Sequence, residues 1–288
     1  MTIPHYDHVV IVGPGLIGGS LGMALKRAGL AGRVTGVGHR QVSLDRAVEM
    51  NAVDSTSLDV ASSVHDADLV VLATSVARIR EQIDIVAPRM KPGALLTDVG
   101  SVKGAICAAA LKALKANPER GIRFVGSHPL AGSEQRGIDA AHADLFDGAV
   151  CVVTPAGNDP TEAATRIGEL WKAVGSRVLC VSPEVHDQWL AQVSHMPHVA
   201  ATCIVNAVCD QALDIAATGF LDTTRVASGD PALWADICMD NRVALSTALR
   251  TLAAEVTAFA DDIDTGHIEA LSERLARAKT RRDQRVNG

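Results

Sequence analysis

The feature that most constrains the fold is a glycine-rich turn between a strand and a helix near the start of the chain. Residues 8–12 (HVVIV) form a short β-branched run, and residues 16–28 then have the pattern of a helix that ends at Gly29. Glycines at this spacing allow a tight turn and let a pyrophosphate approach the backbone N–H groups at the positive end of the helix. The turn therefore predicts a dinucleotide site, with a purely structural turn as the alternative. The predicted cofactor-binding residues in it are Gly13, Gly15, Leu16, Ile17 and Gly18.

Strand-like and helix-like runs alternate over the first 182 residues. Continuous apolar runs such as residues 68–73 (DLVVLA) are typical of parallel strands covered on both faces. The predicted class is α/β, with an N-terminal Rossmann-like, doubly wound, mainly parallel sheet. We expect strands at 8–12, 33–37, 68–73, 94–98, 123–125, 150–153 and 177–181, and helices at 16–28, 42–50, 79–86, 102–116 and 161–174.

The pattern changes after Ser182-Pro183. Residues 184–281 hold no convincing strand, only Ala-, Leu- and Val-rich helical stretches broken at prolines and glycines such as Pro197 and Gly266. We therefore expect residues 1–182 to form a dinucleotide-binding domain and residues 183–288 an all-α domain for substrate binding and dimerisation. Its last helices are apolar enough to pack against a second copy, which favours a homodimer.

Composition excludes several classes of protein. The chain has 288 residues, 48% of them hydrophobic, and a net charge of −6, which argues against disorder and against a basic nucleic-acid-binding surface. Six cysteines without a C-x-x-C pair favour reduced thiols in the cytosol. The uncharged run 9–25 is interrupted by glycines and Pro14, so we expect no membrane span there and a soluble, cytoplasmic protein.

The end of the second expected strand bears on the choice of dinucleotide. NAD sites usually place Asp or Glu there to hold the ribose 2′-hydroxyl, whereas this chain has Gly38. His39 and Arg40 follow and could instead face a 2′-phosphate, or they could be a solvated loop pair. The cofactor is predicted to be NAD or NADP, and NADP is favoured.

Two polar clusters follow later strands, at the sheet edge where open α/β sheets bind ligands. They are residues 98–103 (DVGSVK) and residues 126–134 (GSHPLAGSE). His128 stands before Pro129 on what we expect to be a loop of small residues, where a neutral imidazole is a plausible base near neutral pH. Ser101 either caps the following helix or belongs to the site.

A third cluster opens the helical part with residues 186–189 (HDQW) and 194–198 (SHMPH). Helical spacing predicts that Gln188, Gln192 and His195 are polar neighbours on one face. His195 and His198 are either core histidines or pocket residues. Because no further ligand residue stands at metal spacing beyond Asp187, we expect no metal site.

A fourth cluster spans residues 222–234 (DTTRVASGDPALW). Asp230 followed by Pro231 is a helix start and needs no functional explanation. Arg225 on the preceding segment is not explained by that start, and it is either a surface arginine or a ligand for an anion.

Together these motifs resemble the prephenate/arogenate (cyclohexadienyl) dehydrogenase family of tyrosine biosynthesis. The glycine turn, D-x-G-S-V-K, G-x-H-P-x-A-G-x-E, H-D…S-H-x-P-H and the TRVASGDPALW segment occur in this order over nearly the whole chain. The resemblance implies a Rossmann-type domain, a helical domain that forms the dimer, and an active site between them. It also implies oxidative decarboxylation of prephenate to 4-hydroxyphenylpyruvate, or of arogenate to tyrosine, with hydride transfer to NAD(P).

The resemblance assigns roles to individual residues. His128 would accept the substrate's hydroxyl proton, and Ser101 would hydrogen-bond near that hydroxyl and contact the cofactor. Arg225 would bind a substrate carboxylate, for which a planar guanidinium is well suited. The other predicted pocket residues are His198, His195 and Trp234, and Glu134, whose anion would favour the ammonium of arogenate over the keto-acid of prephenate.

Two rival interpretations come from other classes. A related two-domain dehydrogenase of β-hydroxy acids would carry a glycine-rich second-domain motif with a catalytic lysine, which is not visible here. A non-catalytic dinucleotide-sensing module would leave the clusters around His128 and Arg225 without a purpose.

Overall fold

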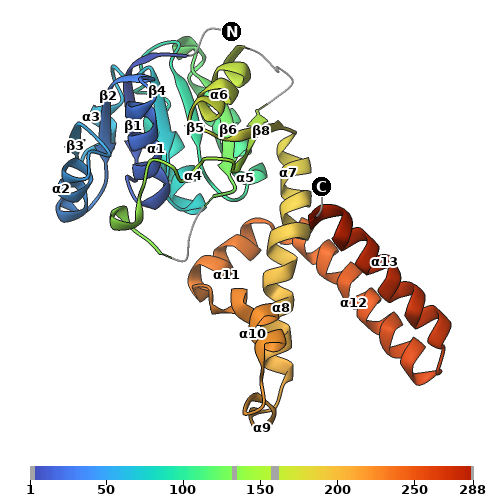
Figure 1. The fold of residues 1–288 in the computed structure, drawn as a ribbon. Coiled ribbons are helices and arrows are strands. Elements are labelled where there is room, and N and C mark those ends of the chain that lie inside the picture. Colours follow the sequence, from blue (N-terminus) through green and yellow to red (C-terminus); the bar gives the residue numbers. More distant parts are fainter. Residues whose placement is uncertain (1–3, 132–134, 157–161, 287–288) are drawn as a thin grey trace. The chain divides into compact units, whose positions relative to one another are not determined.

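The computed structural model describes residues 4–131, 135–156 and 162–286, and these residues form two compact units (Figure 1). One unit, called the sheet unit here, comprises the described residues up to Leu190 together with Ser228–Asn241. The other, the helical unit, comprises Ala191–Ala227 and the described residues from Arg242 onward. Helices α7 (Pro183–Leu190) and α11 (Pro231–Asp240), both beyond residue 182, thus belong with the sheet.

Among the described residues, eight strands form one sheet in the order β3-β2-β1-β4-β5-β6-β7-β8. Strands β1 to β6 run parallel, β7 pairs antiparallel with β6, and β8 pairs parallel with β7. This arrangement confirms the predicted α/β class with a mainly parallel sheet. The strands are β1 (Tyr6–Val12), β2 (Ala31–Val37), β3 (Ser55–Ser57), β4 (Leu69–Leu72), β5 (Leu95–Asp98), β6 (Arg123–Pro129), β7 (Val150–Pro155) and β8 (Arg177–Cys180).

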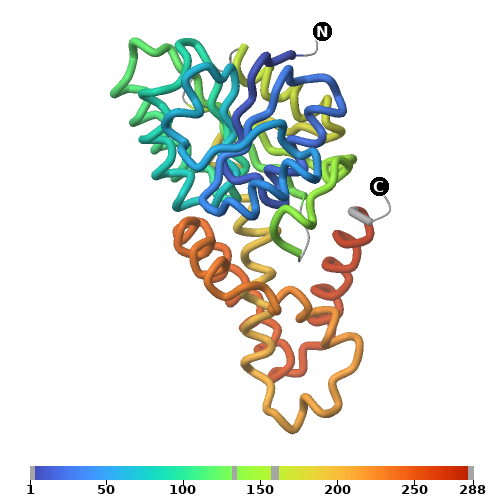
Figure 2. The backbone as a smooth tube through the Cα atoms, turned by 90° about the vertical axis from the view of Figure 1, so that its left-hand side faces the viewer, coloured from blue at the N-terminus to red at the C-terminus, as the bar shows by residue number. Residues whose placement is uncertain are grey.

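Helices cover both faces of the sheet because successive strand residues point to opposite sides. Val9 and Ile11 of β1 join a core with α1 (Leu16–Arg27) and α6 (Glu162–Ala173). Val10 and Val12 join a second core with α4 (Val76–Val86) and α5 (Gly104–Ala116). Figure 2, turned by 90°, shows the blue-to-green part of the chain gathered in one compact region. The remaining elements of the sheet unit are α2 (Gln41–Glu49), α3 (Val60–Ser63) and the 3₁₀ turns Pro118–Arg120 and Ile138–Ala140.

The helical unit begins with a π-helical turn, Ala191–His195, that leads directly into α8 (Met196–Ala207). The expected break at Pro197 is therefore wrong, because helical structure runs from Pro183 to Ala207 without interruption. Proline lacks an N–H and crowds the carbonyl four residues earlier, and the wider π turn accommodates both effects. The unit continues with α9 (Asp210–Leu213), α10 (Thr218–Thr224), the 3₁₀ turn Arg225–Ser228, α12 (Arg242–Asp264) and α13 (Ile268–Val286).

Helix α12 packs against α13 and α8 but leaves much apolar surface exposed. Of the helices that the structure describes, it alone is long and apolar enough to cross a membrane, judged by length and composition only, and 11% of the tested window is buried. In the part of the chain that the structure describes, α12 and α13 therefore both carry large apolar side chains that are exposed. The large apolar side chains exposed there are Val243, Val256, Ile263, Ile268 and Leu275.

Candidate active site

The glycine turn after β1 has the backbone that the sequence predicts. Gly13 has φ +94°, and a Cβ added to it would lie 2.7 Å from the carbonyl oxygen of Ala73. A Cβ on Gly18 would lie 2.3 Å from the oxygen of Gly13, whereas one on Gly15 would meet nothing within 4 Å. No side chain caps the N-terminus of α1. The turn thus packs tightly on one side and presents Gly15 and the positive end of a helix on the other.

A cavity of about 630 Å³ opens beside this turn, at the carboxyl ends of β1, β2 and β4. The strand order reverses between β1 and β4, which is where open α/β sheets bind nucleotides. Its lining includes the predicted Gly13, Gly15, His39 and Arg40 but not Leu16, Ile17, Gly18 or Ser101. The uncapped helix end and the open side of Gly15 therefore fit a dinucleotide.

The cavity lining carries basic side chains. His39 and Arg40 follow Gly38 directly after β2, Arg78 comes from α4, and the lining that the structure describes holds no Asp or Glu. A Cβ at Gly38 would approach the Cδ2 atom of Leu44 to 3.1 Å, so an acidic side chain would require Leu44 to move slightly. The described lining thus offers cationic groups and no carboxylate to a ribose 2′-substituent.

His128 lies inside β6 and not on a loop, so the predicted loop position is wrong. Strand β6 continues past residue 125 because it pairs with β7, where His128 stands opposite Val152. The imidazole is thereby fixed to the sheet by its own backbone, close to the carboxyl end of the strand.

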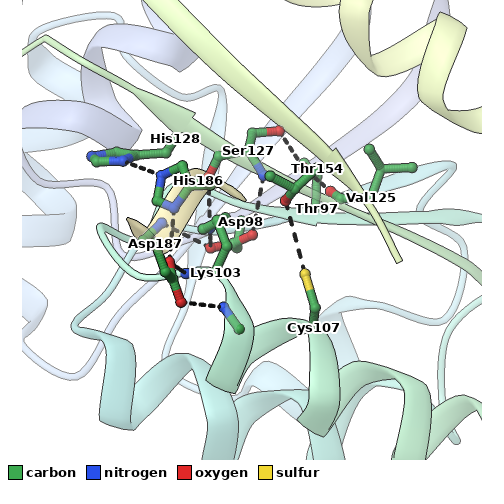
Figure 3. A network of polar contacts seen from close by, with 12 residues as sticks. Thr97, Asp98, Lys103, Cys107, Val125, Ser127, His128, Thr154, His186 and Asp187 are labelled. Atoms are coloured by element: carbon green, nitrogen blue, oxygen red, sulfur yellow. Dashed lines mark hydrogen bonds and ion pairs between the residues drawn. The ribbon is translucent and has the colours of Figure 1, made fainter. Parts of the chain in front are cut away.

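Ser127, the residue before His128, is held by three neighbours (Figure 3). Its N–H donates to Asp98 Oδ1 over 3.2 Å, and its carbonyl accepts from Lys103 Nζ over 2.7 Å. Its hydroxyl lies 2.8 Å from Thr97 Oγ1. Lys103 and Asp98 also form an ion pair, and both side chains are 0% exposed. Both residues belong to the predicted DVGSVK cluster, but no local pattern in the sequence indicates their role.

His128 is joined to the start of the helical region by a chain of polar contacts (Figure 3). Its Nδ1 atom lies 2.9 Å from Nε2 of His186, and Nδ1 of His186 lies 2.8 Å from Oδ1 of Asp187. The His186 ring is 0% exposed, and this burial lowers its pKa below the ordinary value. The His-Asp pair belongs to the third predicted cluster, but its contact with His128 was not predicted from the sequence.

Asp187 in turn caps α5 from a distant part of the chain. Its carboxylate accepts from the backbone N–H of Lys103 over 2.7 Å and from that of Gly104 over 2.8 Å. The N-cap residue of α5 is Lys103, without a side-chain cap, so Ser101 does not cap this helix. Ser101 lies partly buried in the bend between β5 and α5.

The remaining predicted pocket residues divide between the two units. Trp234, on α11, belongs to the sheet unit and is partly buried. His195, at the end of the π turn, and His198, on α8, are buried in the helical unit, and burial lowers the pKa of His198. Arg225 begins an exposed 3₁₀ turn of the same unit. Glu134 lies outside the described residues.

The expected polar face of Gln188, Gln192 and His195 is wrong. Both glutamines are exposed, whereas His195 is 2% exposed. The π turn has more residues per turn than an α-helix, so it shifts the angular position of His195. Within the part of the chain that the structure describes, no group of three His, Cys, Asp or Glu side chains could hold a metal ion.

Comparisons with known proteins point to one family. The family model described as "Prephenate dehydrogenase, nucleotide-binding domain" matches residues 21–205, and "Prephenate dehydrogenase, dimerization domain" matches residues 182–277. The cyclohexadienyl dehydrogenase of Zymomonas mobilis is 34% identical over 263 residues, which cover 89% of this chain and 87% of that protein. The chain spans 64% of the length of the longer prephenate dehydrogenases of Bacillus subtilis and Lactococcus lactis.

Solved structures agree over almost the full length. Synechocystis arogenate dehydrogenase has a TM-score of 0.85 at 30% identity and covers 96% of this chain and 99% of its own. Prephenate dehydrogenase from A. aeolicus, in complex with hydroxyphenyl propionate and NAD⁺, has a TM-score of 0.88 at 28% identity and covers 96% of this chain and 98% of its own.

Proposed function

Because the chain belongs to the prephenate dehydrogenase family, we propose that it oxidatively decarboxylates prephenate, arogenate or both, with NAD or NADP as the acceptor. The observation that carries the proposal is His128, fixed in β6 and bonded at Nδ1 to a buried histidine. An imidazole bonded at one nitrogen and held by its backbone is a suitable general base for a substrate hydroxyl.

The substrate is a cyclohexadienol that carries a ring carboxylate and a side-chain carboxylate. His128 takes the proton of the C4 hydroxyl as the C4–H bond breaks and the C4–O bond becomes a carbonyl. A bound nicotinamide would supply the acceptor for the hydride that leaves C4. The bond from the ring to its carboxylate then breaks and CO₂ leaves. The electron pair of that bond makes the ring aromatic as the C4 carbonyl becomes a phenolate oxygen, which takes up a proton. Aromatisation drives the reaction, so the protein needs mainly to orient the base and the substrate.

The other predicted residues bind the substrate in this proposal. Ser101 donates a hydrogen bond near the reacting hydroxyl, and the Arg225 guanidinium holds a carboxylate. His195, His198 and Trp234 line the pocket. Glu134 selects arogenate over prephenate by attracting its ammonium, and an unchanged ratio of kcat/KM for the two substrates in Glu134→Gln would remove that role.

We infer that NADP is accepted at least as well as NAD. The cavity lining offers His39 and Arg40 after β2 and Arg78 from α4, while Gly38 supplies no carboxylate to repel a 2′-phosphate. Specificity is a difference of affinities, so the missing repulsion counts as much as the added cations.

We also infer a cytosolic homodimer. The exposed apolar side chains of α12 and α13 lie within residues matched by the dimerisation-domain model, so a second copy is a suitable cover for them. The same cover accounts for the apolar length of α12 without a membrane. All six cysteines are free thiols, which suits a reducing compartment.

One experiment tests the proposed function. The purified protein is incubated with prephenate and with arogenate, each with NAD and with NADP, and reduced dinucleotide and aromatic product are measured together. We expect equal amounts of both in at least one combination, and a kcat about 10²- to 10⁴-fold lower in His128→Asn. Cofactor binding without product in every combination would leave the sensing module as the better interpretation.

A further inference from the structure

We propose that His186 and Asp187 are positioning residues that hold His128 in its Nδ1–H form, so that Nε2 is the atom that receives the substrate proton. This inference rests on the proposed function, in which His128 is the base. The contacts that fix the direction of each hydrogen bond all lie within the sheet unit.

Asp187 sets the direction at one end of the chain of contacts. Its two oxygens accept from the N–H groups of Lys103 and Gly104, which can only donate. These groups stand at the N-terminus of α5, whose positive end favours an ionised carboxylate. An ionised carboxylate has no hydrogen to give, so Nδ1 of His186 must donate to Oδ1.

The protonation of His186 determines which atom donates in its hydrogen bond with His128. Its ring is completely buried, and burial favours the neutral form, which carries one hydrogen only. Because that hydrogen is on Nδ1, the Nε2 atom of His186 is an acceptor. It lies 2.9 Å from Nδ1 of His128, which must therefore donate. The basic atom of His128 is then Nε2.

The surroundings keep these three side chains in place. Asn241, at the end of α11, donates to the carbonyl of Asp187 over 2.8 Å, so α7 is held from that side as well. The buried pair Lys103 and Asp98 fixes the backbone at Ser127, directly before His128. The charged groups that face the His186 ring are thus Asp187, Lys103 and Asp98.

The arrangement resembles in role the carboxylate of a Ser-His-Asp triad, which holds its histidine in one tautomer. Here a neutral imidazole stands between the carboxylate and the base. When His128 takes up the proton at Nε2, its Nδ1–H bond to His186 becomes charge-assisted and therefore stronger. The assembly thus favours the state that follows proton transfer.

Two substitutions of His186 separate positioning from packing. In His186→Phe the ring shape remains but the acceptor is lost, so we expect kcat to fall about a hundredfold, while substrate KM and cofactor Kd stay close to wild type. In His186→Gln the amide oxygen can take the place of Nε2, so we expect part of kcat to return. His267→Phe, at an exposed histidine, is the matched control.

Equal kcat in His186→Phe and wild type would overturn the inference, and so would equal losses in His186→Phe and His186→Gln. These outcomes leave the proposed function intact as long as His128→Asn is inactive. Retained activity in His128→Asn would instead remove the base itself, together with everything argued from it.

A direct measurement covers the case in which His186→Phe fails to fold. Nitrogen chemical shifts of ¹⁵N-histidine-labelled wild-type protein, with the His128 signals assigned by their loss in His128→Asn, report which ring nitrogen carries hydrogen. We expect the Nδ1–H form in the protein alone. The Nε2–H form would overturn the inference whatever the kinetics show.

Discussion

Lys103 and Asp98 form an ion pair in which neither side chain is exposed to solvent. Removing one partner of such a pair leaves the other charge buried and costs about 3–5 kcal/mol. We therefore expect Lys103→Met to lower the free energy of unfolding by about that amount in urea denaturation, and Asp98→Asn combined with it to recover part of the loss.

The exposed pair of Lys91 and Asp68 supplies the control for this prediction. Its side chains are 49% and 22% exposed, and surface pairs contribute about 0–1 kcal/mol. If Lys91→Met and Lys103→Met destabilise the protein equally, the buried pair has no special role in stability.

Arg225 is predicted to act on the substrate and not on the cofactor. A charged hydrogen bond contributes roughly 1.5–3 kcal/mol, so we expect Arg225→Ala to raise substrate KM about tenfold to hundredfold with unchanged dinucleotide affinity. Arg225→Lys keeps the charge but loses the planar, two-pronged hydrogen bonding of the guanidinium. Its substrate KM should therefore lie between those of wild type and Arg225→Ala. An unchanged KM would show that Arg225 is an ordinary surface arginine.

The choice of dinucleotide depends on Gly38 and Arg40 in the proposal. Arg40→Ala should lower kcat/KM for NADP more than for NAD, because only NADP carries the 2′-phosphate. Gly38→Asp should act in the same direction by adding repulsion, since its Cβ displaces only the end of the Leu44 side chain. Steady-state kinetics with both cofactors provide the measurement, and a wild-type preference for NAD that neither change alters would contradict the assignment.

Burial of His186 predicts a pH dependence of stability. The folded protein holds the pKa of His186 below the ordinary value of 6.5 that the unfolded chain regains. Its stabilising contribution is therefore complete above that value and is lost as the pH falls below it, because the unfolded state then binds the proton more readily. We expect the urea midpoint of wild type to fall as the pH is lowered below about 6.5, and to fall less in His186→Gln.

His8 and His198 also have pKa values lowered by burial, so the wild-type slope includes their protons as well. The comparison of wild type with His186→Gln isolates one residue. Parallel curves for the two proteins would show that His186 takes up its proton equally well in both states.

The main strands of the sheet could be predicted because each is a run of apolar residues and the runs recur at the spacing of alternating strands and helices. Short polar elements could not, as β3 and α3 show, since Ser55–Ser57 has no apolar residue and Val60–Ser63 is a single turn. The full length of β6, which extends beyond the expected residues 123–125 to Pro129, could not be predicted for a related reason. Gly126, Ser127 and His128 are not strand-forming by themselves, and they are held by β7, Asp98 and Lys103.

The sequence predicted those parts of the candidate site that a single motif forms, but not the contacts between motifs that are distant in the sequence. Local pattern alone indicated the glycine turn and also His39 and Arg40, which line the cavity; their contact with a dinucleotide stays a prediction. The contact between His128 and His186 spans 58 positions, and no local signal indicates it. The π turn before Pro197 could not be predicted either, because the spacing of apolar and polar residues was interpreted for a regular α-helix.

The cap that Asp187 places on α5 also bears on how the protein folds. The bond between Lys103 and Asp187 closes a stretch of 84 residues, and contacts this distant in sequence carry a larger entropic cost than local ones. The strands and crossover helices up to β5 can form before α7 exists in its final position. The orientation of His128 cannot, because it depends on α7 being docked. During refolding, enzymatic activity should therefore return later than the burial of the sheet. In a nascent chain that ends before α7, the nucleotide-binding fold would be formed but His186 would not yet orient the imidazole of His128.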